Sequence, residues 1–219
     1  MTIDFDVYVI TDRQQTGNRP LREVVEAALR GGVRALQLRE KDLPPRQLYP
    51  LARDLRQLTQ QYGACLLIND RVDVALAADA DGVHLTTTSL PIGVTRQLVG
   101  AERLIGVSTH NLGEARAAAD GGADFVVFGP VFFTPSKAAY GEPVGLDALR
   151  AVRAAVKLPL LAIGGIKQAN LEPVLAAGAD GVAVISAVIA ADDPTSASQD
   201  LLAALRAAKT ARADHFGVP

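Results

Sequence analysis

The sequence lacks the features that mark several classes of protein. It has one cysteine in 219 residues, so no disulfide can form within the chain, and Cys65 is expected in the core. Lys and Arg number 22 against 24 Asp and Glu, which leaves no basic surplus for nucleic acid or an anionic membrane. No apolar run reaches the roughly 18 residues of a membrane-spanning helix, and MTIDFDVYVI has no signal-peptide pattern. We therefore expect a cytoplasmic protein.

What the sequence does contain is a series of short apolar runs. Each is apolar throughout, which is typical of a parallel strand covered on both faces. There are eight of them: VYVI (7–10), ALQL (35–38), CLLI (65–68), GVHL (82–85), LIGV (104–107), FVVF (125–128), LLAI (160–163) and VAVI (182–185). Segments with helical spacing lie between them. In 21–30, for example, the apolar residues fall on one helix face, and a last helix is expected near 194–209.

The alternation of strand and helix predicts an α/β fold. Eight βα units in 219 residues favour a single domain over residues 1–219, folded as one (β/α)8 TIM barrel. An open doubly wound sheet usually has a glycine-rich dinucleotide turn after its first strand, but here TDRQQTG follows, with no GxGxxG pattern. The joints ADADGV (78–83), GGADFV (121–126) and AGADGV (177–182) repeat one phrase, as expected of a repeated unit.

Polar side chains gather after the predicted strands. In such barrels, ligands bind at the carboxyl ends of the strands and in the loops after them. The candidates there are Asp12, Gln37, Arg39, Lys41, Asn69, Asp70, His84, residues 86–89, Ser108, His110, Thr134, Ser136, Lys137, Gly164, Gly165 and Ser186. The opposite strand ends offer mainly Gly, Ala and Asp. This asymmetry predicts a functional pocket on one rim of the barrel.

Several of these residues have two interpretations. Asn69 or Asp70 could cap the helix that starts near Arg71, or Asp70 could hold a metal ion, because a carboxylate that faces phosphates is a usual Mg²⁺ ligand. In QLREK, Gln37 and Arg39 lie two residues apart and therefore point to the same side of a strand. A surface charge run is the alternative. An inward arginine after a buried strand needs an anion, which favours a binding role.

The segment AIGGI (162–166) is a candidate phosphate site. Two glycines after the seventh strand allow backbone amides to approach a phosphate at the start of the next helix. The loops after strands seven and eight form the commonest phosphate site of this fold. Ser186 either completes this site or caps a helix. His84, within GVHL, is interpreted as a core histidine rather than a catalyst.

With these residues placed, the chain resembles the thiamine phosphate synthase family and the related TenI thiazole tautomerases. The resemblance runs from about residue 6 to residue 200, and its phrases are QLREKD (37–42), NDRVDVAL (69–76), DGVHL (81–85), GVSTH (106–110), GPVFFTPSK (129–137), AIGGI (162–166) and ADGVAVISAV (179–188). It implies a transferase that joins hydroxymethylpyrimidine diphosphate to a thiazole phosphate. The products would be thiamine phosphate and pyrophosphate. The cofactor would be Mg²⁺.

The resemblance also implies roles for individual residues. The residues that would contact the pyrimidine diphosphate are Gln37, Arg39, Lys41, Asn69, Ser108 and Lys137, with Asp70 on the magnesium ion. Of these, Arg39, Lys41 and Lys137 would stabilise the leaving pyrophosphate. The residues that would hold the thiazole phosphate are Thr134, Ser136, Gly165, Ile185 and Ser186. The partners are then small phosphorylated molecules, and a homodimer is a family-level expectation.

Two positions depart from the patterns of these families. Ser89 stands where the synthases have a second acidic magnesium ligand, and a neutral hydroxyl is a poorer ligand than a carboxylate. Pro130 stands where the tautomerases have a catalytic histidine. We expect synthase activity because the diphosphate-binding set is complete. The alternatives are a TenI-like tautomerase and a non-catalytic regulatory barrel that binds thiazole phosphate or thiamine phosphate.

Overall fold

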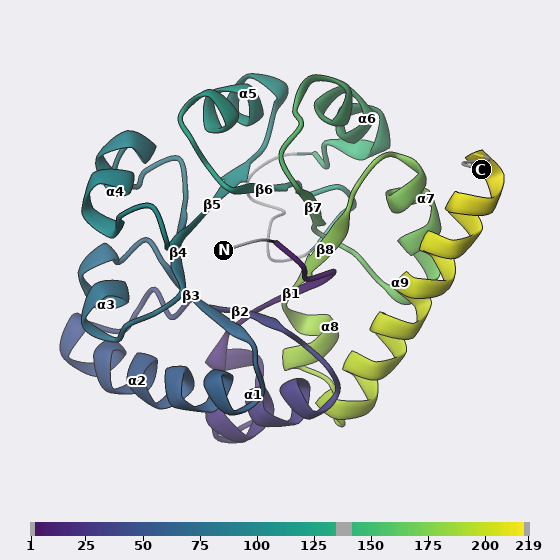
Figure 1. The fold of residues 1–219 in the computed structure, drawn as a ribbon. Helices are drawn as coiled ribbons and strands as arrows, with labels where there is room; N and C mark the ends of the chain where they lie inside the picture. The colour runs from purple at the N-terminus through teal and green to yellow at the C-terminus, as the bar shows by residue number, and fades with distance from the viewer. Residues whose placement is uncertain (1–2, 135–141, 217–219) are drawn as a thin grey trace.

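The computed structural model describes residues 3–134 and 142–216, and in this part of the chain the strands close into a barrel. Eight parallel strands pair in sequence order from β1 to β8, and β8 pairs with β1 to complete the ring (Figure 1). Helices surround the ring on the outside. The predicted α/β barrel is therefore confirmed.

The strands lie close to the apolar runs of the sequence. They are β1 (Val7–Ile10), β2 (Ala35–Leu38), β3 (Cys65–Asn69), β4 (Gly82–Leu85), β5 (Leu104–Thr109), β6 (Phe125–Phe128), β7 (Leu160–Ile163) and β8 (Gly181–Val184). β3 and β5 continue past their apolar runs, because Asn69, Ser108 and Thr109 still pair with neighbouring strands. β8 begins and ends one residue early, so Ile185 comes directly after the strand.

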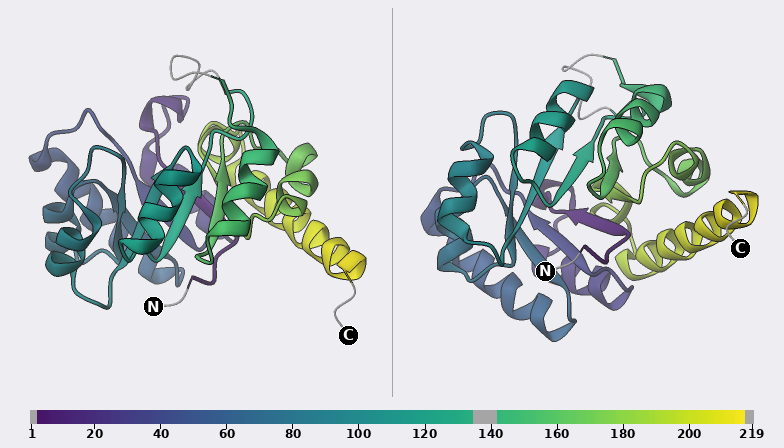
Figure 2. Two further views of the ribbon diagram at one scale, coloured as in Figure 1. Left: turned by 90° about the horizontal axis from the view of Figure 1, so that it is seen from above. Right: turned by 45° about the horizontal axis from the view of Figure 1, so that its top comes forward.

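The helices cover the outside of the ring with one apolar face each. They are α1 (Leu21–Arg30), α2 (Pro45–Gln61), α3 (Val72–Ala77), α4 (Ile92–Val99), α5 (Leu112–Asp120), α6 (Gly145–Ala155), α7 (Leu171–Ala176), α8 (Ser186–Ile189) and α9 (Pro194–Phe216), with short 3₁₀ helices η1 (Arg13–Gln15) and η3 (Gln168–Asn170). α9 runs further than predicted, and its last turns extend beyond the barrel (Figure 2). No helix in the described residues combines the length and apolarity that a membrane crossing requires.

Apolar side chains form two separate cores, one inside the ring and one outside it. Successive residues of a strand point to opposite faces, so Tyr8 and Ile10 belong to the inner core, while Val7 and Val9 pack with the helices. Gln37 lies two residues after Ala35 of the inner core and is also buried. The β2 strand therefore carries a polar side chain into the barrel, as its sequence predicts.

The three repeated joints each carry an aspartate with the same two contacts. The carboxylates of Asp81, Asp124 and Asp180 accept the backbone N–H of Leu66, Ile105 and Leu160 at 2.8, 2.6 and 2.8 Å, and they pair with Arg56, Arg96 and Arg153 at 2.6, 2.6 and 2.9 Å. Each aspartate thus joins its own strand to the preceding strand and to a helix. These three aspartates, each of which directly precedes a strand, therefore have a structural role.

The two ends of the barrel differ in what they carry. The N-terminus lies at one end, and residues 129–134, which come after β6, lie at the opposite end (Figure 2). The carboxyl ends of all eight parallel strands meet at that second end, which we call the mouth. The predicted polar residues that the structure describes lie at the carboxyl ends of their strands or after them and therefore belong to the mouth.

Candidate active site

Three polar side chains reach the mouth from different strands. Gln37, Asn69 and Ser108 come from β2, β3 and β5, and the first two are buried while Ser108 is half-buried. Asn69 lies in register with His84 on the neighbouring β4. Its side-chain amide makes no hydrogen bond with the residues that the structure describes. The amide is therefore available to a ligand in the mouth.

A chain of hydrogen bonds crosses the barrel interior and joins two of these side chains, Gln37 and Ser108. The Gln37 Nε2 donates to the Tyr8 hydroxyl over 3.1 Å, and this hydroxyl lies 3.4 Å from His84 Nδ1. His84 Nε2 in turn lies 2.9 Å from the Ser108 hydroxyl. The chain links β2, β1, β4 and β5. It holds the side chains of Gln37 and Ser108 in fixed positions on opposite sides of the barrel interior.

The histidine in this chain is neutral. Burial lowers the pKa of His84 from 6.5 to about 3, and the positive charge of Arg39 acts in the same direction. The Tyr8 hydroxyl is fully buried, and His84 Nδ1 is the acceptor that the described residues offer to its proton, so His84 carries its own proton on Nε2 and donates it to Ser108. The Ser108 proton is then free to point at a ligand. The interpretation of His84 as a core histidine is confirmed.

Aromatic rings close the barrel beneath the chain. Phe5, Tyr8 and Phe125 are buried, with ring centroids 5.5 to 5.7 Å apart and Phe125 edge-on to the other two. Gly106 leaves the space for this packing, because a Cβ at that position would lie 2.3 Å from Phe125 Cζ and 2.7 Å from His84 Nδ1. A ligand in the mouth therefore meets polar groups above an aromatic floor.

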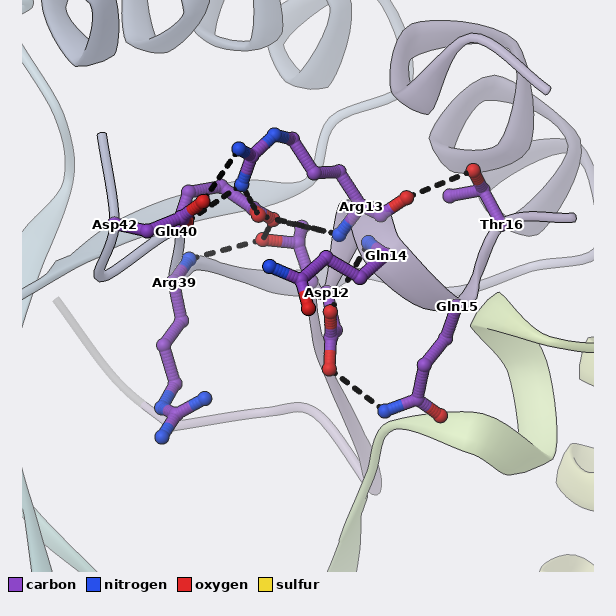
Figure 3. A network of polar contacts seen from close by, with 9 residues as sticks. Asp12, Arg13, Gln14, Gln15, Thr16, Arg39, Glu40 and Asp42 are labelled. Carbon is purple, nitrogen blue, oxygen red and sulfur yellow. Dashed lines mark hydrogen bonds and ion pairs between the residues drawn. The ribbon is translucent and has the colours of Figure 1, made fainter. Parts of the chain in front are cut away.

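Two cations come after β2. Arg39 is half-buried, and its guanidinium makes no hydrogen bond or ion pair with the described residues, although its charge reaches His84. Figure 3 shows the Arg39 side chain directed away from the carboxylates of Glu40 and Asp42. Lys41 is exposed and also lacks a carboxylate partner within residues 3–134 and 142–216. Both cations are therefore available to an anion.

Asp70 has an uncommon backbone conformation. Its φ is 63°, in the left-handed region that Asp and Asn tolerate better than most residues. Its N–H donates to the His84 carbonyl over 2.9 Å, and its side chain is exposed. α3 begins at Val72 with Arg71 in the capping position, so the interpretation of Asn69 or Asp70 as a helix cap is wrong. The turn leaves an exposed carboxylate beside the mouth.

The donor set around Asp70 suits magnesium only together with a ligand. No group of three or more His, Cys, Asp and Glu that could hold a metal ion occurs in the described residues. The Ser89 hydroxyl accepts the Thr86 N–H over 2.8 Å and lies 3.2 Å from the Thr86 hydroxyl, so it is engaged in its own turn. Mg²⁺ is often bound by one carboxylate, waters and substrate phosphates. The residues therefore fit a magnesium ion that arrives with a phosphorylated molecule.

The loops after β6 and β7 meet at two glycines. Gly164 and Gly165 have φ of 96° and 63°, and the Phe132 N–H donates to the Gly164 carbonyl over 3.1 Å. A Cβ on Gly165 would lie 2.6 Å from the Phe133 carbonyl oxygen, so a larger residue does not fit. Asn170 Nδ2 donates to the Gly165 carbonyl over 2.9 Å. The Gly165 N–H has no partner among the described residues, as a phosphate site requires.

The other predicted residues of this half lie around the glycines or outside the described chain. Ile185 is half-buried and packs against the inner core. It also takes the capping position of α8, so the interpretation of exposed Ser186 as the cap is wrong. Thr134 is half-buried. Ser136 and Lys137 lie outside the residues that the structure describes.

Tyr8 and Glu40 are absent from the residues predicted from the sequence. Tyr8 lies within the apolar run VYVI, and only its inward position relative to Gln37 indicates a polar role. Glu40 lies within the charged run QLREKD but is 5% exposed. A buried carboxylate needs partners, so the burial of Glu40 indicates a structural role. The charged run in the sequence does not show this burial.

A cavity of about 410 Å³ lies at the opposite end of the barrel. Its lining includes Asp6, Arg153, Asp180 and Lys209. These four residues form two ion pairs, Lys209 with Asp6 at 2.6 Å and Arg153 with Asp180 at 2.9 Å. Four of the six charged side chains that line the cavity, which also include Asp4 and Lys157, thus satisfy one another. The cations and the amide that have no partner in residues 3–134 and 142–216 make the mouth the candidate active site.

Known proteins resemble this chain over most of its length. A family model described as thiamine monophosphate synthase matches residues 7–188. A protein of Geobacter sulfurreducens, provisionally named thiamine-phosphate synthase, is 60% identical over 203 residues, which cover 93% of this chain and 95% of that protein. The thiamine-phosphate synthase of Chloroflexus aurantiacus is 50% identical over 201 residues, or 92% and 93% of the two chains. The solved structure of thiamine phosphate pyrophosphorylase from Pyrococcus furiosus matches with a TM-score of 0.85 and 42% identity, covering 93% and 96%.

Proposed function

The chain belongs to the thiamine monophosphate synthase family, and from this premise we propose that it is a transferase that makes thiamine phosphate. Hydroxymethylpyrimidine diphosphate would donate the pyrimidine group, a thiazole phosphate would accept it, and pyrophosphate would leave. The single observation that carries the proposal is the half-buried Arg39, whose guanidinium has no described partner in a mouth lined by neutral polar groups.

The reaction makes clear chemical demands on a site. The bond between the pyrimidine methylene carbon and the diphosphate oxygen breaks, and its electrons leave with pyrophosphate. The thiazole nitrogen then uses its lone pair to form a bond with this carbon, so no proton has to be transferred. The site must stabilise the negative leaving group and align two rings. A neutral, buried His84 is consistent with a reaction that needs no general base.

The neutral groups of the mouth suit the pyrimidine ring. Gln37 and Ser108 are held by the hydrogen-bonded chain through Tyr8 and His84, and Asn69 has a free amide beside them. Amides and hydroxyls pair with ring nitrogens and an exocyclic amine without adding charge. We assign these three residues to the pyrimidine.

The cations of the mouth suit the diphosphate. Arg39 can bind phosphate oxygens with two N–H groups, and exposed Lys41 adds a second charge. Asp70 would hold a magnesium ion together with the diphosphate, and the ion, when bound, would neutralise charge on the leaving pyrophosphate. Lys137 is assigned to the same group by the family resemblance alone. Ser89 is left out of the donor set because its hydroxyl is engaged by Thr86.

The glycine turn after β7 suits the phosphate of the thiazole. The Gly165 N–H is unpaired in the described chain, and Ser186 at the start of α8 offers an exposed hydroxyl. Ile185 would give the thiazole ring an apolar contact, and Thr134 a further hydroxyl. Ser136 belongs to this group by resemblance. The homodimer and the cytoplasmic location expected from the sequence stay predictions.

A pyrophosphate-release assay tests the proposed function. The purified protein should release pyrophosphate only when both substrates and Mg²⁺ are present. Arg39→Gln should reduce the rate at least tenfold, while Arg103→Gln, which removes a peripheral arginine paired with Asp79, should not. Release from the pyrimidine diphosphate alone would indicate a hydrolase. No release under any metal, with tight binding of thiazole phosphate, would favour the tautomerase or the regulatory barrel.

A further inference from the structure

We propose that Thr11 and Glu40 form a positioning pair that holds Arg39 in place for the diphosphate. The pair connects the loop after β1 to the loop after β2, and neither residue is one of the proposed ligand contacts. The inference rests on the proposed function, because Arg39 is the group through which the pair acts. It adds two residues that set the affinity for pyrophosphate without touching it.

The hydrogen-bond ladder between β1 and β2 changes at Thr11. The Thr11 N–H donates to the Gln37 carbonyl over 2.9 Å and so continues the parallel ladder. The next bond of a regular ladder would join the Arg39 N–H to the Thr11 carbonyl. Instead, the Arg39 N–H donates to the Thr11 hydroxyl over 2.9 Å. A side chain thus replaces the backbone acceptor where Arg39 leaves the sheet.

The bonds of the Thr11 hydroxyl can run in only one direction. A backbone N–H can only donate, and an ionised carboxylate can only accept. The hydroxyl therefore accepts from the Arg39 N–H and donates its one proton to Glu40 Oε1, 2.7 Å away. Because the Thr11 hydroxyl donates its hydrogen bond to Glu40, a lone pair of the same oxygen faces the Arg39 N–H. The charge of Glu40 is what fixes this direction.

Glu40 is itself held by Arg13. The backbone N–H of Arg13 lies 3.2 Å from each Glu40 oxygen, and its guanidinium lies 3.2 Å from Oε2. The same guanidinium donates to Asp42 over 2.6 Å and lowers the pKa of that carboxyl to about 2. A buried carboxylate without such partners would be costly. Arg13 therefore supplies the partners that the buried Glu40 carboxylate needs.

The two arginines of this network are in different states. Arg13 is engaged by Glu40 and Asp42, whereas the Arg39 guanidinium is directed away from them (Figure 3). Glu40 is the carboxylate next to Arg39 in the sequence, but its oxygens are already taken by Thr11 and Arg13. The network therefore fixes the backbone of Arg39 and leaves its charge unpaired. A side chain that starts from a fixed backbone position loses less entropy when its unsatisfied charge binds an anion.

Binding of inorganic pyrophosphate in the presence of Mg²⁺, measured by calorimetry on the full chain, tests the pair. Thr11→Val keeps the shape of the side chain and removes the hydroxyl, and it should raise the Kd at least tenfold. Thr11→Ser restores the hydroxyl and should bring the Kd back to within threefold of the original protein. Glu40→Gln, which keeps the size of the side chain and removes its charge, should also weaken binding.

Thr59→Val is the matched control for a lost buried hydroxyl. Thr59 is buried in α2, and its hydroxyl donates to the Arg56 carbonyl over 3.0 Å, away from the mouth. This variant should keep the Kd for pyrophosphate. If Thr11→Val and Glu40→Gln both bind as tightly as Thr59→Val, the positioning pair is wrong. Should Thr11→Val fail to fold, the Kd of Glu40→Gln for pyrophosphate is compared with that of Thr59→Val. Equal values would then overturn the positioning pair.

A double variant separates positioning from a general structural role. If Thr11 acts through Arg39, Thr11→Val should add less than twofold to the Kd once Arg39→Gln is present. Fully additive losses would show that Thr11 supports the fold rather than Arg39, and would overturn the inference. The proposed function fails separately, if the unaltered protein releases no pyrophosphate when both substrates and Mg²⁺ are present.

Discussion

His84 Nε2 on β4 lies 2.9 Å from the Ser108 hydroxyl on β5, in the interior of the barrel. The imidazole is 1% exposed, so the bond is formed away from bulk water. It is the link through which a neutral ring sets the direction of a hydroxyl at the mouth. The same burial makes the protonation of His84 unfavourable, which has a measurable effect on stability.

Acid should destabilise the fold through His84. The pKa is lowered from 6.5 to about 3 in the fold, so between these values the unfolded chain binds the proton and the folded chain does not. The stability is fully present above about pH 6.5 and falls as the pH drops toward 3. The slope approaches about 1.4 kcal/mol per pH unit below pH 6.5, so the loss between pH 6.5 and 4.5 is about 2 to 3 kcal/mol.

Urea unfolding at pH 7.5 and 4.5 measures this effect. His84→Gln should lose about 2 to 3 kcal/mol less over this range than the unaltered protein. His110→Gln removes an exposed imidazole and is the comparison variant. An equal loss in His84→Gln and the unaltered protein would contradict the prediction.

Asp70→Asn should raise the Mg²⁺ concentration needed for pyrophosphate release by at least tenfold. The substitution removes the charge but keeps a residue that tolerates the φ of 63°. Asp73→Asn is the control, because Asp73 lies nearby in α3 and pairs with Arg71. A titration of activity against Mg²⁺ checks the result. The same half-maximal concentration in both variants would remove Asp70 from the metal site.

Gly165→Ala should impair both the fold and the thiazole phosphate site. The added Cβ would lie 2.6 Å from the Phe133 carbonyl oxygen and would also have to adopt a φ of 63°. Gly63→Ala is a close control, with a φ of 60° and no atom within 4 Å of the added Cβ. The control should cost about 1 kcal/mol in the free energy of unfolding.

The difference between the two glycine variants isolates the crowding at Gly165. Gly165→Ala should lose more stability than the control and should raise the KM for thiazole phosphate at least tenfold, with the KM for the pyrimidine diphosphate nearly unchanged. Chemical unfolding and steady-state kinetics give both values. A KM for thiazole phosphate equal to that of Gly63→Ala would argue against a phosphate site at this turn.

Asp81→Ala should destabilise the protein by about 2 kcal/mol. It removes the ion pair with largely buried Arg56 and leaves the Leu66 N–H without its acceptor. Asp147→Ala removes the partner of Arg150 on the surface of α6, where both side chains are exposed, and should change stability by less than about 0.5 kcal/mol. Urea unfolding of both variants at pH 7.5 decides whether the repeated joint has this role.

The barrel was predictable from the sequence because its strands are short, apolar and regularly spaced. Local patterns of this kind depend on near neighbours in the chain, and VYVI or FVVF can be recognised without knowing what pairs with them. The strand ends were less predictable. Asn69 and Thr109 extend β3 and β5 through pairing with other strands, and a local apolar pattern does not contain that information.

The candidate site was predictable where a residue type and a strand end coincide. Gln37, Arg39 and Asn69 satisfy this condition. Tyr8 does not, because a tyrosine in an apolar run gives no indication that its hydroxyl joins a chain between strands. Glu40 was not predictable for another reason. A carboxylate in a charged run is usually solvated, and the burial of Glu40 depends on Arg13, which comes from another loop.

The aromatic floor closes the barrel interior on the side away from the mouth. The rings of Phe5, Tyr8 and Phe125 fill the described interior below the mouth. A ligand of this site would therefore enter and leave through the mouth, and a compound that covers the mouth would block both entry and release.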